Sequence, residues 1–382
     1  MKYFGVSGVF NHDAGICVLD DKGNIEFATL SERYTKTKHD PLIPAELFEE
    51  HYYPIQEQTK LCINEDWGLR THFRTGYLQE MQKDSPHRFD KDFKLLHKKH
   101  PSTFVDQHGA VYAEHHQTHA AAALMTRPKD WDRSDCVVVV IDGIGEFRSA
   151  GVYDSNLKLL WEMTFPKSIG YLYANFTDQC GLGLKSNNDE YVVMGLSSYG
   201  SPTHWQELKE MFDKVPEWAL DEVGDYVVED AHWSVIYDHK LMHLNKMISF
   251  LKNNCNTVED AAASLQRMTE EVILSVMREA RKYGSKLCYS GGVAQNIVAN
   301  GRVAELFDDM WVDLNPGDGG ACLGAAAIQL FHDTGIDRLN WEHPFLGHNI
   351  EGDLDPEFVV DQLLSERVCG IANGRAAVSY TH

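Results

Sequence analysis

The sequence lacks several features that mark whole classes of proteins. It has 8 cysteines in 382 residues, none of them in a C-x-x-C pair. Cys136 and Cys322 lie in apolar runs, which is typical of small core residues in a reducing compartment. The first residues contain no signal-peptide hydrophobic region, and no apolar run reaches the roughly 18 residues of a membrane span. These absences count against a disulfide-linked or membrane-bound protein and predict a cytoplasmic one.

Positive charge is also scarce. Lys and Arg number 35 against 57 Asp and Glu, for a net charge of -22. Such a balance opposes binding to a phosphate backbone, so duplex DNA is disfavoured as a partner. It suits a neutral or cationic small molecule, or a site whose own metal supplies positive charge, although solubility alone explains it equally simply. With 43% hydrophobic and 24% charged residues, the chain is globular and long enough for two domains or one large duplicated one.

One order of strands and turns occurs twice in the chain, which predicts an internal duplication. In both copies a strand is followed by a polar turn, a second strand, a tight turn and a third strand. The predicted strands are residues 2–10, 14–20 and 25–31 in the first copy, and 136–142, 149–154 and 157–165 in the second.

The later part of the chain alternates helices and strands, which predicts an α/β fold. Apolar residues at helical spacing predict a long helix over 258–284, ended by Gly284. A short strand over 285–290, another over 310–315 and a small-residue helix over 321–330 follow. Within 43–130, the charged, His-rich run 84–100 predicts a solvated surface helix or loop; a lid near the acceptor site is the alternative.

A duplicated three-strand unit with trailing helices is the plan of the actin-like ATPases. We therefore predict a duplicated actin-like α/β fold with two mixed sheets, flanked by helices, around a nucleotide cleft. In that plan the first turn of each copy grips the phosphates; here these are 11–13 and 143–146. Glycine in such a turn lets backbone N–H groups approach an anion, although without the repeat an ordinary hairpin is the simpler interpretation of either turn.

Two histidines in the run AEHHQTHAAAA are the sharpest chemical signal. His115 and His119 are four residues apart, so on a helix they share one face and can bind one metal ion. No HEXXH glutamate lies between them, which disfavours a zincin protease. The bland alternative is a pair of hydrogen-bonded core or surface histidines.

Two aspartates are candidates to complete such a site. Asp142 ends the predicted strand 136–142, and Asp318 lies in the Gly-rich loop PGDGG. Strand ends and Gly-rich loops are where α/β folds place ligand-facing groups. Two His and two Asp suit Fe²⁺, Zn²⁺ or Mn²⁺ better than Cu(I). Fe²⁺ is our first prediction, with Zn²⁺ or Mn²⁺ as alternatives.

Three further runs contain candidate anion or nucleotide contacts. SGGVAQNIVANG, at 290–301, places two glycines between a strand and a helix, which favours a phosphate or an adenosine but is neither a GxGxxG fingerprint nor a P-loop. SERYTKTKHD, at 31–40, offers Lys38 as a phosphate partner or simply as part of a solvated edge. In the third run Ser168 is a predicted helix cap, and Gly170 permits close backbone approach.

In combination and in this order, these runs resemble the carbamoyltransferase family of nodulation-factor and antibiotic O-carbamoyltransferases. The matching stretches are GVSGVFNHDAG, SERYTKTKHD, AEHHQTHAAAA, VVIDGIGE, SIGYLYANFT, EYVVMGLSSYG, SGGVAQNIVANGRV and NPGDGGACLGAAA, within about residues 3 to 327. A more distant likeness exists to the tRNA threonylcarbamoyl-transferring proteins, which share the actin-like plan and the H-x-x-x-H pair.

The resemblance implies a function and a set of site residues. The actin-like domain of the family moves a carbamoyl group from carbamoyl-adenylate to a hydroxyl, and a second domain makes that adenylate from ATP and carbamoyl phosphate. Motif by motif, it implies metal ligands at His115, His119, Asp142 and Asp318. It implies nucleotide contacts at Gly170, Gly291, Gly292, Val293 and Asn296, with Lys38 facing the phosphates and His12 beside the reacting centre. Gly143, in the second turn of the actin-like plan, is a further candidate nucleotide contact.

The chain departs from the family pattern in two places. Val192 stands where the family usually has a lysine. The run 368–376 is similar to the approach to the second-domain signature, but AVSYTH follows it. We therefore expect an actin-like carbamoyl-transfer domain at 1–345, with lobes at about 1–130 and 131–345, and the start of a truncated adenylate-synthase-like domain at 346–382. A separate chain supplying that domain is an expected partner.

The proposed chemistry needs a base to accept the proton of the acceptor hydroxyl. His12 is the candidate because its near-neutral pKa suits that task, and Asp13 is the alternative. A sugar, an antibiotic or a hydroxymethylated nucleotide is the expected small-molecule acceptor. Two other functions stay open at this point: an actin-like kinase or ATPase, and a nucleotide-binding partner subunit without activity of its own.

Overall fold

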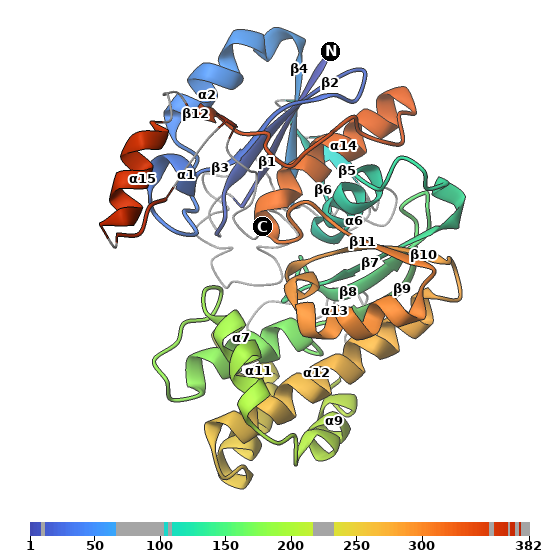
Figure 1. The fold of residues 1–382 in the computed structure, drawn as a ribbon. Helices are drawn as coiled ribbons and strands as arrows, with labels where there is room; N and C mark the ends of the chain where they lie inside the picture. The colour runs from blue at the N-terminus through green and yellow to red at the C-terminus, as the bar shows by residue number, and fades with distance from the viewer. Residues whose placement is uncertain are drawn as a thin grey trace.

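The computed structural model describes residues 1–8, 12–65, 103–105, 109–216, 233–350, 355–365, 367–370 and 374–375. Asn11 of the first predicted turn, the predicted surface segment 84–100 and the terminal AVSYTH lie outside the described residues. Within the described ranges the elements form two large β-sheets, one above the other, with helices between and around them, and one small two-stranded sheet (Figure 1).

The first sheet is built from the N-terminal third of the chain. Its strand order is β3-β2-β1-β4-β6-β5. β1 pairs antiparallel with β2 and parallel with β4, β2 pairs antiparallel with β3, and β4 pairs parallel with β6. The strands are β1 (Lys2–Ser7), β2 (Gly15–Asp20), β3 (Ile25–Leu30), β4 (Thr59–Asn64), β5 (Thr103–Val105) and β6 (Val111–Ala113).

The second sheet repeats this arrangement. Its order is β11-β10-β7-β8-β9, with β7 antiparallel to β8 and parallel to β10, β8 antiparallel to β9, and β10 parallel to β11. The strands are β7 (Cys136–Ile141), β8 (Arg148–Tyr153), β9 (Leu159–Thr164), β10 (Lys286–Ser290) and β11 (Asp309–Val312). β9-β8-β7-β10-β11 therefore corresponds to β3-β2-β1-β4-β6. The predicted duplication and the actin-like α/β fold with two mixed sheets are confirmed.

Two helices pack against each other between the sheets. α6 (His115–Met125) follows β6 but packs on β7 and β10 of the second sheet, and α14 (Ala321–Thr334) follows β11 but packs on β1, β2 and β4 of the first. They meet at Gly324, where a Cβ would lie 1.8 Å from the carbonyl oxygen of Thr118. Only glycine permits that approach, so the small residues of both helices set the distance between the sheets. The predicted lobe boundaries at 130 and 345 stay predictions.

The other face of the second sheet is covered by helices with a shared core. α12 (Val258–Ala280) buries Leu265, Met268, Val272, Val276 and Ala280, as its helical spacing predicts. The predicted end at Gly284 is wrong by four residues. The chain turns after Ala280 because Gly284 passes the backbone of β7, where a Cβ would lie 2.8 Å from the amide nitrogen of Val137. The neighbouring helices are α7 (Ile169–Gln179), α8 (Glu190–Leu196), α9 (Trp205–Asp213), α11 (Trp233–Asn254) and α13 (Ile297–Val303).

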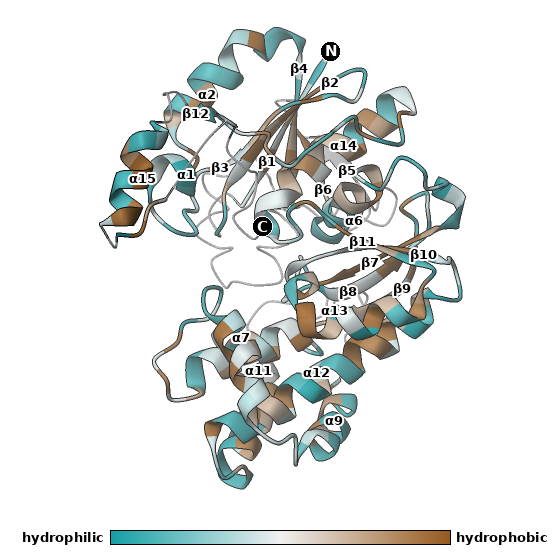
Figure 2. Cartoon of the chain, viewed as in Figure 1, coloured by the Kyte–Doolittle hydropathy of each residue, from teal (hydrophilic) through white to brown (hydrophobic). Residues whose placement is uncertain are grey.

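Short elements complete the described part of the fold. α1 (Glu32–Thr35) and α2 (Ala45–His51) follow β3. Later in the chain, α15 (Pro356–Leu364) lies between β12 (Asn349–Ile350) and β13 (Gly374–Arg375), which pair antiparallel. In Figure 2 the strands of both sheets are mainly hydrophobic, and α12 alternates hydrophobic and hydrophilic bands. Among the described residues, no helix has the length and apolar character needed to cross a membrane.

Candidate functional site

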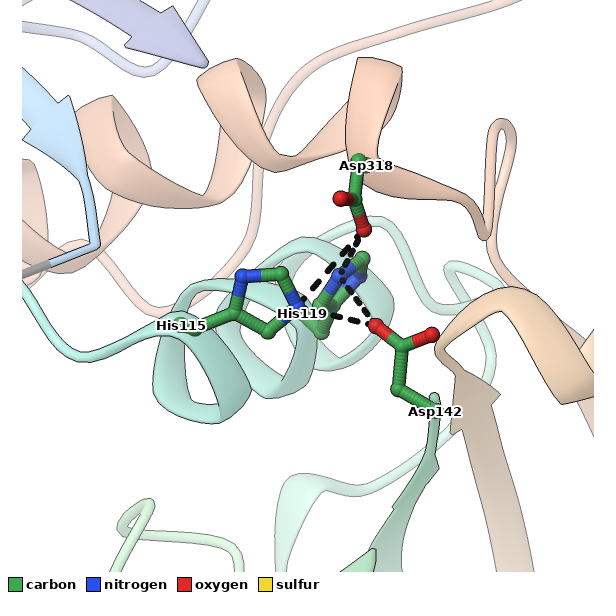
Figure 3. Close-up of side chains that lie close together, drawn as sticks. All are labelled: His115, His119, Asp142 and Asp318. Atoms are coloured by element: carbon green, nitrogen blue, oxygen red, sulfur yellow. Dashed lines mark hydrogen bonds and ion pairs between the residues drawn. The ribbon is translucent and has the colours of Figure 1, made fainter. Parts of the chain in front are cut away.

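Four side chains from three parts of the chain converge where α6, β7 and α14 meet. His115 and His119 lie on α6, Asp142 follows β7, and Asp318 begins the short 3₁₀ turn Asp318–Gly320 that leads into α14. Their ligand atoms all lie within 4.8 Å of one another, and Figure 3 shows them pointing at a common centre. The four residues lie far apart in the sequence. The crossing of α6 and α14, one helix from each half of the duplication, brings them together.

The distances leave room for a cation between these groups. Nε2 of His115 lies 2.9 Å from Oδ2 of Asp142 and 3.6 Å from Oδ1 of Asp318. Nε2 of His119 lies 3.6 Å and 3.5 Å from the same two oxygens. Although His119 is fully buried, its Nε2 makes no hydrogen bond within the described residues. A buried ring nitrogen that makes no hydrogen bond yet faces two carboxylates fits a metal ligand, and two imidazoles with two carboxylates suit Fe²⁺, Zn²⁺ or Mn²⁺.

The carboxylates and imidazoles of this site shift one another's pKa through their charges. Burial raises the pKa of Asp318, but the charges of His115 and His12 outweigh it and hold this pKa well below its usual range. Burial also lowers the pKa of His115, yet the charge of Asp318 and the hydrogen bond to Asp142 raise it overall. The metal-free site therefore keeps two ionised carboxylates beside an imidazole that readily takes a proton, and a bound cation competes with that proton.

A further layer of side chains holds the two histidines from behind. Nδ1 of His115 lies 2.8 Å from Oε1 of Glu65, which follows β4 and is 2% exposed. Nδ1 of His119 contacts Oγ of Ser290 at 3.2 Å, and Ser290 donates to Oδ2 of Asp313 at 3.1 Å. Metal-binding histidines ordinarily have such a partner on the second ring nitrogen, which fixes the tautomer and leaves Nε2 for the metal.

Asp142 is oriented by the glycine turns around it. Its Oδ1 accepts from the amide of Gly143 at 2.7 Å and from that of Gly292 at 3.3 Å. Gly170 packs against this turn so closely that a Cβ would lie 2.8 Å from the carbonyl oxygen of Asp142. Gly291 has φ 92° and leaves only 2.3 Å between a Cβ and the carbonyl oxygen of Ile141. These glycines, which sequence reasoning selected as nucleotide contacts, thus also have a packing role at the end of β7.

The first turn of the chain lies on the other side of Asp318. Nε2 of His12 is 3.5 Å from Oδ2 of Asp318, and Nδ1 of His12 hydrogen-bonds Oδ2 of Asp13 at 2.8 Å. Oδ1 of Asp13 in turn hydrogen-bonds Nδ1 of His39 at 2.7 Å. The predicted catalytic pair is therefore adjacent to the predicted metal ligands, and His39 joins it.

The remaining candidates lie farther along the second half or bridge to it. Lys38 donates through Nζ to Oδ1 of Asn188, a residue of the second predicted lobe. Val293, in the 3₁₀ turn Gly292–Gln295, is partly buried against the core of the second sheet. The side chain of Asn296 caps α13 by accepting from the amide of Ala299, and it exchanges hydrogen bonds with the buried Gln266. Its side-chain amide is thus engaged within the protein.

The second turn also supports the metal-ligand helix. The carboxylate of Glu146 accepts from the backbone amide of His115 at 3.0 Å and 3.2 Å, so it satisfies a free N–H at the start of α6. A negative charge at a helix N-terminus is stabilising as well. On α7, Ser168 accepts from the amide of Tyr171, which confirms it as a helix cap.

Comparison with known proteins identifies the family. Residues 2–327 match the family described as "Carbamoyltransferase N-terminus". The chain belongs to this carbamoyltransferase family. The predicted resemblance is therefore confirmed over most of the chain.

Relatives in this family are considerably longer than the chain. An uncharacterized protein of Synechocystis sp. is 29% identical over 369 residues, which cover 86% of this chain and 56% of that protein. Nodulation protein NolO of Bradyrhizobium diazoefficiens is 32% identical over 221 residues, 56% of this chain and 37% of that protein. Nodulation protein NolNO of Sinorhizobium fredii is 28% identical over 333 residues, 84% of this chain and 46% of that protein. The chain spans about half the length of these curated relatives.

Solved structures similar to the chain have low sequence identity. The activator of the 2-hydroxyisocaproyl-CoA dehydratase from Clostridium difficile with bound ADPNP is 13% identical, covers 90% of this chain and 100% of its own, and has a TM-score of 0.45. Full-length HypF in the phosphate- and nucleotide-bound form is 13% identical to the chain and has a TM-score of 0.38. The match covers 86% of this chain and 55% of HypF.

Sequence reasoning missed four residues of this site. Glu65 contacts His115, Ser290 contacts His119, and Asp313 accepts a hydrogen bond from Ser290. The fourth is His39, which contacts Asp13. Ser290 and His39 are neighbours of the selected residues Gly291 and Lys38, so their motifs contained a signal. Glu65 and Asp313 directly follow β4 and β11. No strand was predicted before Glu65, and the predicted strand 310–315 runs past Asp313, so the strand-end position that identified Asp142 pointed to neither residue.

Proposed function

We propose that this chain contains the transfer site of an O-carbamoyltransferase, which moves a carbamoyl group from carbamoyl-adenylate to a hydroxyl of a small molecule. The observation behind the proposal is the convergence of His115, His119, Asp142 and Asp318 beside His12, in a chain of the carbamoyltransferase family. The nodulation relatives support carbamoyl transfer in general. The adenylate as donor and the hydroxyl as acceptor are the finer part of the proposal.

In this proposal the four-residue cluster binds a divalent transition metal, with Fe²⁺ as the first candidate. A metal bound there supplies Lewis-acid and template chemistry for a phosphate or acceptor oxygen. Glu65 and the Ser290–Asp313 pair hold the histidine rings so that both Nε2 atoms face the centre. Gly143 and Gly292 orient Asp142 through their amides.

The nucleotide half of the donor is proposed to bind on the second lobe. The amides of Gly291 and Gly292 already donate to the carbonyl of Pro316 and to Asp142, so these glycines are proposed to admit the nucleotide by close backbone approach at the start of the 3₁₀ turn that also contains Val293. Lys38 is proposed to exchange its contact with Asn188 for the phosphate. Because the side chain of Asn296 is engaged with Gln266, its proposed contact with the nucleotide is indirect, through the position of α13.

His12 is the proposed base for the acceptor hydroxyl. Burial lowers the pKa of His12, but the charge of Asp318 and the hydrogen bond with Asp13 raise it overall. A cation at the neighbouring cluster counters the charge of Asp318 and so favours the neutral ring that a base requires. A positioned base typically contributes about 10²–10⁴-fold in rate.

Formation of the adenylate is proposed to occur outside the site described above. ATP and carbamoyl phosphate are the proposed precursors, and a domain similar to the threonylcarbamoyl-adenylate synthases, in the same protein or in a separate chain, is the proposed source. A sugar, an antibiotic or a hydroxymethylated nucleotide is the proposed acceptor, and the cytoplasm is the proposed compartment.

The test supplies the protein with preformed carbamoyl-adenylate and a panel of sugars, aminoglycosides and hydroxymethyl nucleotides. Mass spectrometry detects a carbamoylated acceptor, and chromatography detects AMP. The proposal expects both products in equal amounts, and their loss in the His12→Ala variant. A parallel incubation replaces the adenylate with ATP and Mg²⁺. Release of ADP there, without carbamoylated product in the first incubation, would indicate an actin-like kinase or ATPase, and nucleotide binding without turnover in either would indicate an inactive partner subunit.

A further inference from the structure

The carboxylate of Asp13 joins two imidazoles that lie far apart in the sequence. Oδ2 hydrogen-bonds Nδ1 of His12 at 2.8 Å, and Oδ1 hydrogen-bonds Nδ1 of His39 at 2.7 Å. All three side chains are partly buried, with exposed fractions of 27% for His12, 17% for Asp13 and 22% for His39. Each carboxylate oxygen thus has its own imidazole, and the Asp13 side chain has little freedom to rotate.

The backbone around this arrangement is held in an uncommon conformation. Asp13 has φ 58° and His39 has φ 57°, left-handed values that non-glycine residues rarely adopt. The two segments are tied together by a hydrogen bond from the amide of Ala14 to the carbonyl of Asp40, and the amide of His39 donates to Glu32 at 3.0 Å. Strained backbone of this kind persists where the surroundings fix it, and it clusters at functional sites.

The contacts define the tautomer of His12. Burial raises the pKa of Asp13, but the hydrogen bonds from His12 and His39 outweigh it and lower this pKa overall. An ionised carboxylate only accepts hydrogen bonds, so both Nδ1 atoms carry hydrogen. A neutral His12 then has its lone pair on Nε2, the atom that lies 3.5 Å from Asp318 at the edge of the predicted metal cluster.

We propose that His39 is a positioning residue of the transfer site: by holding one oxygen of Asp13, it fixes the other against Nδ1 of His12 and so keeps Nε2 of His12 as the proton acceptor. This inference rests on the proposed function, in which His12 is the base. His39 itself touches neither donor nor acceptor. It acts through Asp13: the acceptor hydroxyl, His12 and Asp13 are the nucleophile, the base and the orienter, and His39 is a fourth member added behind them.

The step that His39 supports is written in full as follows. The acceptor oxygen forms a bond to the carbamoyl carbon while its proton passes to Nε2 of His12. The bond between that carbon and the phosphate oxygen breaks, and AMP leaves with the electron pair. His12 then returns the proton to solvent, so the products are the carbamoylated acceptor, AMP and one proton.

Three substitutions separate positioning from simple packing. His39→Asn keeps a side-chain N–H where Nδ1 stands, so it can still donate to Asp13. His39→Gln places its N–H near the position of Nε2 instead, and His39→Ala removes the donor. His343→Asn, at an exposed histidine far from these contacts, is the matched control.

The first readout needs no catalytic activity. In the protein with ¹⁵N-labelled histidine, at a pH high enough for the His12 ring to be neutral, NMR reports which ring nitrogen of His12 carries hydrogen, and the His12→Asn spectrum assigns that signal. We expect the Nδ1–H form in the wild type, His39→Asn and His343→Asn, and a mixture of tautomers in His39→Ala and His39→Gln. An unchanged His12 signal in His39→Ala overturns the inference, whatever the protein catalyses.

The second readout compares two acceptors with preformed carbamoyl-adenylate. Glycerol offers a hydroxyl that needs a base, whereas hydroxylamine attacks through a nitrogen lone pair that is free at neutral pH. We expect His39→Ala to lower kcat for glycerol about tenfold or more while retaining hydroxylamine transfer, with His39→Asn restoring most of the loss. Equal losses with both acceptors contradict positioning. Failure of the wild type with both acceptors counts against the proposed function, and the NMR result then still decides whether His39 orients His12.

Discussion

Nδ1 of His115 lies 2.8 Å from a carboxylate oxygen of Glu65, and both side chains are almost completely buried. Glu65 has φ 74° and follows β4, whose last residue, Asn64, accepts a hydrogen bond from Thr118 on the same face of α6. The end of β4 therefore holds the start of α6 at two successive residues. This relationship links the first sheet to the predicted metal site.

From this contact we predict that Glu65→Gln weakens metal binding by about 10–100-fold, the usual effect of losing an outer partner of a metal-binding histidine. The affinity is measured by competition with a chromophoric chelator. Glu49→Gln, at an exposed glutamate, is the control and leaves the affinity unchanged. Equal affinities of wild type and Glu65→Gln would show that Glu65 does not orient His115.

The histidine pair itself is predicted to determine metal content. Elemental analysis of the purified chain is expected to find about one transition-metal ion per molecule, and none in the His115→Ala/His119→Ala variant. His204→Ala/His343→Ala removes two partly or fully exposed histidines and serves as the control. Equal metal content in all three proteins would remove the predicted ligands from consideration.

Asp313 gives a prediction for the pH dependence of stability. Burial raises its pKa from 3.8 to about 7, against the smaller opposing influence of His119. Between these values the folded protein binds one more proton than the unfolded chain, so the free energy of unfolding falls as pH rises, by about 1.4 kcal/mol per pH unit. Asp313→Asn is expected to remove this contribution. Urea unfolding of both proteins from pH 4 to 8 measures the difference, and parallel curves would contradict the prediction.

The crossing of α6 and α14 predicts a glycine that cannot be replaced. In Gly324→Ala the added Cβ meets the carbonyl oxygen of Thr118 at 1.8 Å, so the helices must separate, at a cost of about 1–3 kcal/mol or more. Because α6 bears both histidines, metal affinity is expected to fall as well.

Gly195→Ala in α8 is the matched control for this substitution. Its Cβ has no neighbour within 4 Å, so the substitution is expected to stabilise the helix by about 0.5–1 kcal/mol. Chemical unfolding of both variants tests the pair of predictions. Similar stability of Gly324→Ala and the wild type would mean that the crossing tolerates a wider spacing.

The sequence contained the repeated strands and the histidine spacing, and both predictions depended on local patterns. Six strands of the two copies follow from the repeated order of strands and turns, and the buried face of α12 follows from helical spacing. Asp142 and Asp318 were selected because they stand at a strand end and in a glycine-rich loop. These aspartates meet His115 and His119 because α6 and α14 each pack on the sheet of the other half. No local sequence pattern predicts that packing.

The missed residues have the same physical explanation. Glu65 stands 50 positions before His115, and Asp313 reaches His119 only through Ser290. Such partners are determined by strand order in a folded sheet. The glycines 143, 170, 291 and 292 were predicted as ligand contacts from their freedom of approach, and the structure adds that neighbouring backbone or the Asp142 side chain already uses much of that freedom.

Transfer to an acceptor that needs no dedicated binding site tests the central claim most directly. Wild-type protein and the His115→Ala/His119→Ala variant are each incubated with preformed carbamoyl-adenylate and hydroxylamine, beside a protein-free control. The proposed transfer site predicts hydroxyurea and AMP in equal amounts, faster than the control with wild type and at the control rate with the variant. Wild-type protein that binds the adenylate yet forms hydroxyurea no faster than the control would contradict it.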